Sequence, residues 1–356
     1  MKEIETLRKA IDKIDDEILK LLNKRMEFVK EIGILKHTSG TSIYKPEREK
    51  EILNRLKKLS SGNVKNGAIE AIYSEIFAVS RNIELPEKIA FLGPEGTYSH
   101  QAAQSRFGAQ GSYLALNSIE AVFQVLANKE AKYGVVPIEN NTEGVVGITL
   151  DCLGKHEEIK IAAELYMDIH HSFATFAEDV KDVKVIYSHP QGYNQCRQFL
   201  DTHLLNNIEF IPTKSTSQAA KMASENKEAA AICSHIAAKL YKVPTLFAKI
   251  EDNLANRTRF VILSDFKNAK GAKNKTSVLA KTYDKPGGLL ALLQLFNDAK
   301  INLTKLESRP TKGRDFKRIF YLDFEGHIDD ENVQSVLNGK GKNYDIIWLG
   351  SYISED

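Results

Sequence analysis

The first third of the chain carries an apolar stripe at helical spacing. Isoleucines recur every seven or fourteen residues, and other large apolar residues fill the complementary positions: Ile4, Leu7, Ile11, Ile14, Ile18, Leu21, Phe28, Ile32 and Leu35. The stripe predicts a single helix over about residues 2–36. At about 1.5 Å per residue that helix is roughly 50 Å long, more than a small domain buries alone. We therefore expect a dimer of intertwined helices.

Two shorter helices are expected next. Pro46 suits the first turn of a helix that the Ser-Ser-Gly-Asn sequence at 60–63 ends. A third apolar face runs from Ile69 to Ile83, and the residues around Pro86 end it. No strand pattern interrupts these segments, so residues 1–87 are assigned to an all-α domain.

The pattern changes at Lys88, where short β-branched segments begin to alternate with helical ones. The predicted strands cover residues 88–92, 133–138, 159–165, 183–187, 208–211, 229–233 and 260–263. This alternation is typical of an α/β domain, and residues 88–265 suffice for two small lobes with a cleft. After a Lys-, Asn- and Gly-containing linker, residues 275–353 follow the strand and helix order of an α+β ferredoxin-like plait. The predicted fold class is therefore multidomain.

Composition disfavours several classes of protein. The 356 residues include 49 Lys and Arg against 47 Asp and Glu, a net charge of +2 with no basic run, so no nucleic-acid partner is expected. No apolar run approaches the roughly 18 residues of a membrane span. The N-terminus lacks the order of a signal peptide, and the three cysteines are too widely spaced for a disulfide framework or a metal site. We expect a cytoplasmic protein that binds neither membranes nor metals.

Polar side chains interrupt the apolar stripes of the helical domain. Arg25 stands where an isoleucine is expected, and Lys36 lies eleven residues later on the same face. Ser80 interrupts the third stripe, and Glu84 follows one turn later. A charge inside a helical seam is costly unless it is paired. The pattern fits either a salt-bridged seam that fixes oligomer register or a pocket for a small dianion.

The ordered set Leu7-Arg8, Ile14-Asp15, Arg25, Lys36, Arg48-Glu49, Ser80 and Glu84 resembles the all-helical chorismate mutases. The resemblance implies a Claisen rearrangement of chorismate to prephenate, which needs no nucleophile, metal or cofactor. It implies that Arg25 and Arg8 clamp the two carboxylates, with Arg8 supplied by the partner chain.

The same resemblance assigns the remaining mutase residues. Lys36 would donate to the ether oxygen of the substrate, and Glu49 would accept from its hydroxyl. Ser80 would line the carboxylate side, and Lys45 would contact the substrate through its backbone where the family has an Asp. Glu84 replaces a Gln that donates to the ether oxygen. Because a carboxyl group donates only when protonated, we expect burial to keep Glu84 neutral.

Polar sequences also flank the strand ends of the α/β segment, where sites of such domains gather. They are Gly93–Ser99, Pro137–Gly144, Ser188–Gln191, Ser215–Ser217 and Asn256–Phe260. The first is a tight turn into a helix whose free N–H groups suit an anion, although it matches neither a phosphate loop nor a dinucleotide motif. In this order the five sequences resemble the prephenate dehydratases, and Thr258-Arg259-Phe260 is the most specific of them.

The dehydratase resemblance implies loss of water and carbon dioxide from prephenate to give phenylpyruvate. We expect Thr258 to hydrogen-bond or protonate the leaving hydroxyl and Arg259 to bind a carboxylate. Further candidates for the substrate pocket are Thr97, Ser99, Glu139, Asn140 and Ser188. We interpret His170 and His171 as structural residues on opposite sides of a strand, and His189 as a turn residue.

Two motifs mark the last domain. Pro286-Gly287-Gly288-Leu289 opens its first helix, and Glu307-Ser308-Arg309-Pro310 follows that helix. With the plait order they resemble an ACT domain. The resemblance implies that Gly287, Gly288, Leu289, Glu307, Ser308, Arg309 and Pro310 bind phenylalanine at a dimer interface, with feedback inhibition as the result. A plait used only for dimerisation is the alternative.

Together the resemblances predict a mutase, a dehydratase and a phenylalanine sensor in one chain. The expected substrates are chorismate and prephenate, the expected effector is L-phenylalanine, and the expected assembly is a homodimer or homotetramer. Two alternatives remain: a dehydratase whose helical domain only dimerises, and a two-lobed amino-acid sensor without catalysis.

Overall fold

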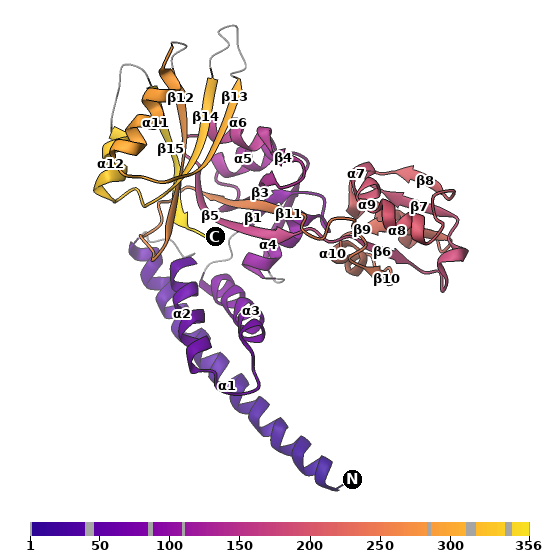
Figure 1. Ribbon diagram of the computed structural model, residues 1–356. Helices are drawn as coiled ribbons and strands as arrows, with labels where there is room; N and C mark the ends of the chain where they lie inside the picture. The colour runs from indigo at the N-terminus through magenta and orange to yellow at the C-terminus, as the bar shows by residue number, and fades with distance from the viewer. Residues whose placement is uncertain are drawn as a thin grey trace. The chain divides into compact units, whose positions relative to one another are not determined.

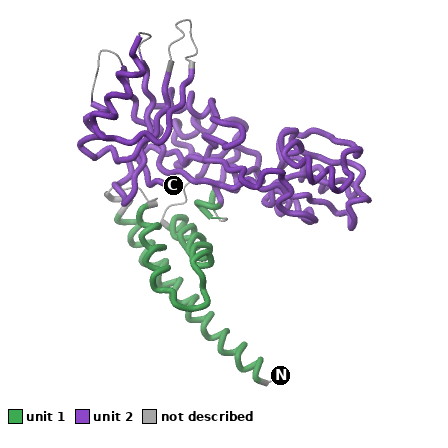
Figure 2. Tube along the Cα trace, in the orientation of Figure 1, with its two compact units in different colours: residues 1–87, 105–112 green, residues 88–104, 113–356 purple. Residues whose placement is uncertain are grey.

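The computed structural model describes residues 2–39, 46–84, 88–108, 111–282, 286–310, 318–338 and 344–355. The chain divides into two compact units (Figure 2). The first contains Met1–Glu87 and Ser105–Ser112, and the second contains Lys88–Gln104 and Tyr113–Asp356.

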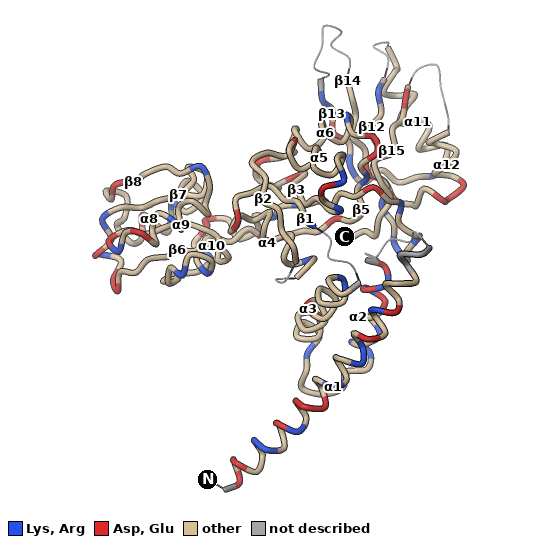
Figure 3. The backbone as a smooth tube through the Cα atoms, turned by 180° about the vertical axis from the view of Figure 1, so that it is seen from behind, with Lys and Arg blue, Asp and Glu red and all other residues tan. Residues whose placement is uncertain are grey.

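The first unit is helical. Its described residues form α1 (Lys2–Ser39), α2 (Pro46–Leu59) and α3 (Asn66–Glu84), together with the end of α4 (Tyr98–Phe107). α3 packs against both α1 and α2, while the N-terminal half of α1 extends beyond them (Figure 1). The expected long helix is confirmed. Its apolar stripe is open to solvent in a single chain: Leu7 is 65% exposed and Ile11 is 56% exposed. Charged residues of both signs follow one another along the same half (Figure 3).

The second unit begins with a mixed sheet. Its strands are β1 (Lys88–Leu92), β2 (Ser112–Leu116), β3 (Tyr133–Asn140), β4 (Gly144–Val145), β5 (Lys160–Asp168) and β11 (Arg257–Ser264). Their order is β2-β1-β3-β11-β5, with β4 beside β3. β11 is antiparallel to both of its neighbours, so the strand that carries Thr258 lies inside the sheet. α5 (Ile119–Ala127) and α6 (Gly147–Lys155) bury their apolar side chains against it.

A second sheet forms the other lobe. It contains β6 (Ser172–Thr175), β7 (Val185–Ser188), β8 (Glu209–Pro212), β9 (Ala229–Cys233) and β10 (Thr245–Ala248), in the order β10-β6-β9-β7-β8. α9 (Thr216–Glu225) and α10 (His235–Leu240) cover one face, whereas α7 (Pro190–Asn194), α8 (Arg197–Thr202) and the short η1 (Val180–Asp182) lie on the other. The chain enters this lobe after β5 and leaves it before β11, so two connections join the lobes. The expected two-lobed α/β arrangement is confirmed.

The third sheet has the expected ferredoxin-like order. β12 (Asn274–Thr282), β13 (Leu303–Pro310), β14 (Arg318–Glu325) and β15 (Tyr344–Ile353) are arranged β13-β14-β12-β15, and every adjacent pair is antiparallel. α11 (Gly288–Asp298) and α12 (Glu331–Asn338) cover one face. The other face joins the core of the first sheet through Leu279, Tyr321, Leu349 and Tyr352.

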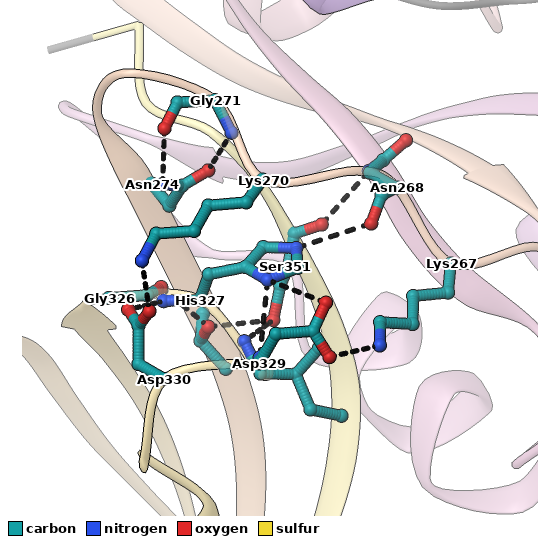
Figure 4. Close-up of polar contacts among 12 residues, drawn as sticks. Lys267, Asn268, Lys270, Gly271, Asn274, Gly326, His327, Asp329, Asp330 and Ser351 are labelled. Atoms are coloured by element: carbon teal, nitrogen blue, oxygen red, sulfur yellow. Dashed lines mark hydrogen bonds and ion pairs between the residues drawn. The ribbon is translucent and has the colours of Figure 1, made fainter. Parts of the chain in front are cut away.

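The segment between β11 and β12 is tied to the third sheet and its connections (Figure 4). The side-chain amide of Asn268 donates to the carbonyls of Ala162 and Ser351, at 2.7 and 2.9 Å. Lys267 and Lys270 form ion pairs with Asp329 and Asp330, on the loop before α12. The predicted linker has no helix or strand of its own, yet these bonds hold it in place.

Candidate active sites

Arg25 and Ser80 meet between α1 and α3. The Arg25 guanidinium donates to the Ser80 hydroxyl and lies 5.9 Å from the centre of the Phe77 ring. Ser80 donates in turn to the carbonyl of Ile76 at 2.6 Å, and its side chain is buried. The structure therefore brings together two of the residues expected at the mutase site.

Arg8 is far from this pair within one chain. It lies seventeen residues before Arg25 on the same helix, which corresponds to about 25 Å. The Arg8 side chain is exposed. A pocket at Arg25 can therefore receive an Arg8 only from a second chain.

Glu49 lies beside a residue that the sequence did not single out. Its carboxylate forms an ion pair with Arg81, which also donates to the carbonyl of Arg106 at 2.6 Å and covers the Phe107 ring at 5.6 Å. The position of Arg81, directly after Ser80, was the available signal. Lys45 and the side chains of Lys36 and Glu84 lie outside the described residues.

A cavity of about 390 Å³ opens between the two lobes of the second unit, within the roughly 300–1,000 Å³ of small-molecule sites. Its lining comes from the β1–α4 turn, the end of β3, the lobe connections, the starts of α7 and α9, and β11. The expected residues Thr97, Ser99, Asn140 and Thr258 are among those that line it.

The oxygen of the Thr258 hydroxyl is held by a hydrogen bond from Asn140. Asn140 donates from Nδ2 to Thr258 Oγ1 at 2.7 Å and to Asn256 Oδ1 at 2.9 Å. Asn140 Oδ1 accepts from the backbone N–H groups of Thr142 and Glu143, at 2.9 and 3.0 Å, so the amide cannot turn round. Among the described residues, the Thr258 hydroxyl bonds only to Asn140, as an acceptor. Its own hydrogen is therefore free to point into the cavity.

The cavity offers hydrogen-bond donors without cationic side chains. In the described part of the chain, neither Lys nor Arg contributes to its lining. Thr97 precedes α4, and Ser215 caps α9 by accepting from the N–H of Gln218 at 3.0 Å. The first N–H groups of a helix and its dipole favour an anion. Two helix starts and several hydroxyls are therefore among the polar groups of the cavity that suit an anion.

A tyrosine and a histidine connect the cavity to the lobe connections. Tyr98 donates to the carbonyl of His170 at 2.9 Å and lies 2.9 Å from His171 Nδ1, while His171 Nε2 lies 2.9 Å from Gln195 Oε1. Burial lowers the pKa of His171 and raises that of Tyr98 well above its usual value. Glu251 accepts from the backbone N–H of His171 at 2.8 Å.

These contacts correct the sequence interpretation of the histidines. His170 and His171 lie in the connection between β5 and β6 and not in a strand, so the argument from opposite strand faces was wrong. His171 lines the cavity, as do Tyr98 and Gln195. Tyr98 stands between two predicted residues, but no local pattern marks Gln195. His189 caps α7 through Nδ1, in agreement with the expected turn role, although it also lines the cavity.

Known protein families match three successive segments of the chain, which correspond to its helical, two-lobed and ferredoxin-like parts. Family models match for chorismate mutase type II over residues 7–85, prephenate dehydratase over 89–268 and the ACT domain over 276–340. A bifunctional chorismate mutase/prephenate dehydratase of Aquifex aeolicus is 38% identical over 99% of this chain and 98% of its own length. This chain belongs to the bifunctional chorismate mutase/prephenate dehydratase family.

More distant members agree with this assignment. The Escherichia coli K12 bifunctional chorismate mutase/prephenate dehydratase is 30% identical over 98% of this chain and 96% of its own length. A prephenate dehydratase from Arthrobacter aurescens, solved in complex with L-Phe, has a TM-score of 0.68 at 30% identity and covers 75% of this chain and 90% of its own. The predicted family, enzyme class and multidomain fold are thus confirmed. None of the described helices is long and apolar enough to cross a membrane.

The dehydratase signature does not act as one unit. Thr258 and Phe260 face the cavity, whereas Arg259 points to the opposite face of the sheet because neighbouring side chains alternate along a strand. The Arg259 guanidinium is 3% exposed and forms ion pairs with Glu164 and Asp323. The expectation that Arg259 binds a substrate carboxylate is contradicted.

Glu139 and Ser188 also lie outside the cavity lining. Glu139 forms an ion pair with Lys305 of β13. Ser188 is fully buried and donates to the carbonyls of His189 and Ile232, at 3.0 and 3.3 Å. Both residues are close in sequence to residues that line the cavity, but their side chains point elsewhere.

The ACT motifs lie at the start of α11 and on β13. Gly287 has a φ of 81°, which suits a residue without Cβ, and Gly288 begins α11. Leu289, Glu307 and Ser308 are partly or largely exposed. Arg309 lies with Nε 3.5 Å from Asp151 on α6. The side chain of Pro310 lies outside the described residues.

Proposed function

We propose that this bifunctional enzyme rearranges chorismate between the helices of two chains and dehydrates prephenate in the interlobe cavity. The observation that supports the second assignment is Thr258, which lines the cavity and whose hydroxyl accepts from Asn140, so that its own hydrogen is free to donate. Domain limits of 1–87, 88–265 and 275–353 fit these tasks.

The proposed mutase site needs two chains. Arg25, supported by Ser80, holds one carboxylate of chorismate, and Arg8 of the partner chain holds the other. Lys36 and Glu84 donate to the ether oxygen, Glu49 accepts from the substrate hydroxyl, and Lys45 contributes its backbone. The open apolar stripe of α1 supports this homodimer, because a second stripe would cover it. Pairing of two dimers through the ACT sheets would give the homotetramer.

The proposed dehydratase reaction consumes one proton overall. The bond between the ring and its carboxylate breaks and releases carbon dioxide, while those electrons enter the ring and expel the hydroxyl, which takes up the proton to leave as water. Thr258 hydrogen-bonds the departing oxygen, where negative charge develops. Thr97, Ser99 and the starts of α4 and α9 receive the remaining carboxylate.

The proposed effector is L-phenylalanine, bound by Gly287, Gly288, Leu289, Glu307, Ser308, Arg309 and Pro310. The Phe complex of the Arthrobacter enzyme supports this choice. We also propose a cytoplasmic location without a nucleic-acid partner. The buried free thiols of Cys196 and Cys233 suit a reducing compartment.

Chorismate supplied to the purified protein tests the proposal. Loss of chorismate together with phenylpyruvate formation, slowed by added Phe, is the expected result. Turnover of prephenate but not chorismate would retire the mutase and leave a helical dimerisation domain. Turnover of neither, with Phe still bound in calorimetry, would favour a sensor. Thr258→Val should abolish phenylpyruvate formation and Thr258→Ser should largely preserve it.

A further inference from the structure

A cluster of buried charges lies where the dehydratase sheet meets the ACT sheet. Arg259 and Glu164 belong to β11 and β5, whereas Lys275 and Asp323 belong to β12 and β14. Their side chains are between 0% and 6% exposed. Two positive and two negative charges balance, and Lys275 donates to Glu164 Oε1 at 2.8 Å. We call these four residues the charge cluster.

Arg259 is the centre of the charge cluster. Its Nε donates to Glu164 Oε2 at 2.8 Å, Nη1 donates to Asp323 Oδ2 at 2.6 Å, and Nη2 donates to the Tyr352 hydroxyl at 2.9 Å. Asp323 Oδ1 accepts from the Ser277 hydroxyl at 2.5 Å. Every nitrogen of the guanidinium is therefore committed, two of them to the ACT sheet. Such fork-shaped pairing fixes direction as well as distance.

The charge cluster lies next to the proposed catalytic hydroxyl. Thr258 and Arg259 are consecutive on β11, so a shift of one side chain moves the backbone of the other. Glu139 stands opposite Arg259 in the β3–β11 register, and the next residue of β3 is Asn140, which orients Thr258. Glu139 is itself paired with Lys305 of β13. Thr258 and Asn140 are thus each next in sequence to a charged residue that is paired with the ACT domain: Arg259 in the first case and Glu139 in the second.

The ACT side of the charge cluster is adjacent to the expected phenylalanine motif. Asp323 stands opposite Lys305 in the β13–β14 register, and Tyr321 stands opposite Glu307. The network therefore extends from the strand of the motif to β11 through one intervening strand. Buried ion pairs resist separation because a lone buried charge is costly, so a movement of β14 is passed to Arg259 and is not absorbed.

We infer that Arg259 is a positioning residue: through Asp323 it lets the ACT domain set the placement of Thr258. This inference rests on the proposed roles of Thr258 and of phenylalanine. It makes Asp323, which no substrate touches, a determinant of dehydratase turnover and of its inhibition.

The test compares Asp323→Asn with Arg257→Met in the full-length protein. Arg257 is a matched control, because it lies two residues before Arg259 on β11 but its side chain is half exposed. Its ion pair with Asp168 is long, with 3.7 Å between Nε and Oδ1. For Asp323→Asn we expect kcat for prephenate to fall by about fivefold or more, and we expect saturating Phe to inhibit the remaining activity much less than in wild type. The KM for prephenate, mutase turnover and Phe binding in calorimetry should stay near wild type. Arg257→Met should match wild type throughout.

Two results would overturn the inference. One is an Asp323→Asn enzyme with wild-type kcat and inhibition. The other is an Arg259→Lys enzyme whose KM rises while kcat and inhibition persist, because that would mark Arg259 as a substrate ligand. If Asp323→Asn fails to fold, Arg259→Met with Asp323→Asn removes one charge of each sign. That double variant should keep mutase turnover and Phe binding and lose inhibition, and retained inhibition contradicts the inference.

Failure of the proposed function gives a different pattern. Full dehydratase activity in Thr258→Val would refute the role of Thr258 while leaving the Asp323 result unchanged. A wild-type enzyme indifferent to Phe would refute the effector, and the effect of Asp323→Asn on kcat would still decide whether the ACT sheet positions β11.

Discussion

Replacing Asn140 with Asp should reverse its hydrogen bond to Thr258, whose hydroxyl we propose to be catalytic. The amide now donates to Thr258 Oγ1 at 2.7 Å, and two backbone N–H groups hold its oxygen in place. A carboxylate at this position has nothing to donate. It would accept the hydrogen of Thr258 instead and draw it out of the cavity, with almost no change in side-chain volume.

The size of the effect follows from the bond that must be broken. A hydrogen bond to a charged group contributes about 1.5–3 kcal/mol, and the hydroxyl must give it up before it can donate to the leaving oxygen. That cost corresponds to a fall in kcat of roughly 10- to 150-fold. Because the groups proposed to bind the substrate carboxylate lie elsewhere in the cavity, KM for prephenate should change much less.

Phenylpyruvate formation from prephenate measures kcat and KM directly, and mutase turnover reports intact folding. Asn141→Asp is the matched control, because Asn141 bonds to the backbone of Ala255 and Arg257 and not to Thr258. Equal losses in the two variants would refute the reasoning, since they would show that the turn as a whole matters. So would an Asn140→Asp enzyme with wild-type kcat.

Three further predictions concern assembly and stability. Arg8→Ala and Arg25→Ala chains should each lack mutase activity. Unfolding them together and refolding the mixture should restore about a quarter of it, since half of the randomly paired dimers regain one of their two sites; no recovery would rule out the shared site. Burial lowers the pKa of His100 from 6.5, so its contribution to stability is present above about pH 6.5 and is lost as pH falls below it, with a slope of up to about 1.4 kcal/mol per pH unit. The free energy of unfolding, measured by chemical denaturation at pH 7.5 and 5.5, should therefore differ less between the two pH values in His100→Gln than in wild type. An equal difference in the two proteins would contradict this. Gly350→Ala would place Cβ 2.3 Å from the Ile161 carbonyl oxygen at a φ of 156°, and a cost of about 1–3 kcal/mol in chemical denaturation is expected; an unchanged midpoint contradicts it.

The sequence predicted those parts of the fold whose periodicity is local. The stripe of α1 was recognisable because its apolar residues recur at helical spacing, and β11 because its buried residues form a continuous apolar run. β6 was missed because its four residues, Ser172–Thr175, begin and end with hydroxyl side chains and form no apolar run. β2 and β10 were missed because they are short and largely uncovered.

The sequence predicted several residues that line the cavity, but it did not predict which way neighbouring side chains point. Side chains alternate along a strand, so Thr258 and Arg259 could not both face one ligand, and that rule alone would have corrected the expectation. The sequence did not indicate that the ACT sheet packs against the other face of the dehydratase sheet. Glu164 of the adjacent β5 pairs with Arg259, but its second carboxylate partner, Asp323, comes from the ACT domain some 60 residues later. Gln195 reaches the cavity from the far lobe, a contact that no local pattern encodes.

The position of β11 has a consequence for synthesis of the chain. It lies between β3 and β5, yet it is made after the whole second lobe, residues 169–256. Until it leaves the ribosome, β3 and β5 lack their common neighbour, and their unpaired edges are open to wrong partners. A nascent chain therefore cannot hold prephenate before its last dehydratase strand is inserted. A chain that ends between β5 and residue 257 should therefore aggregate and should have no dehydratase activity.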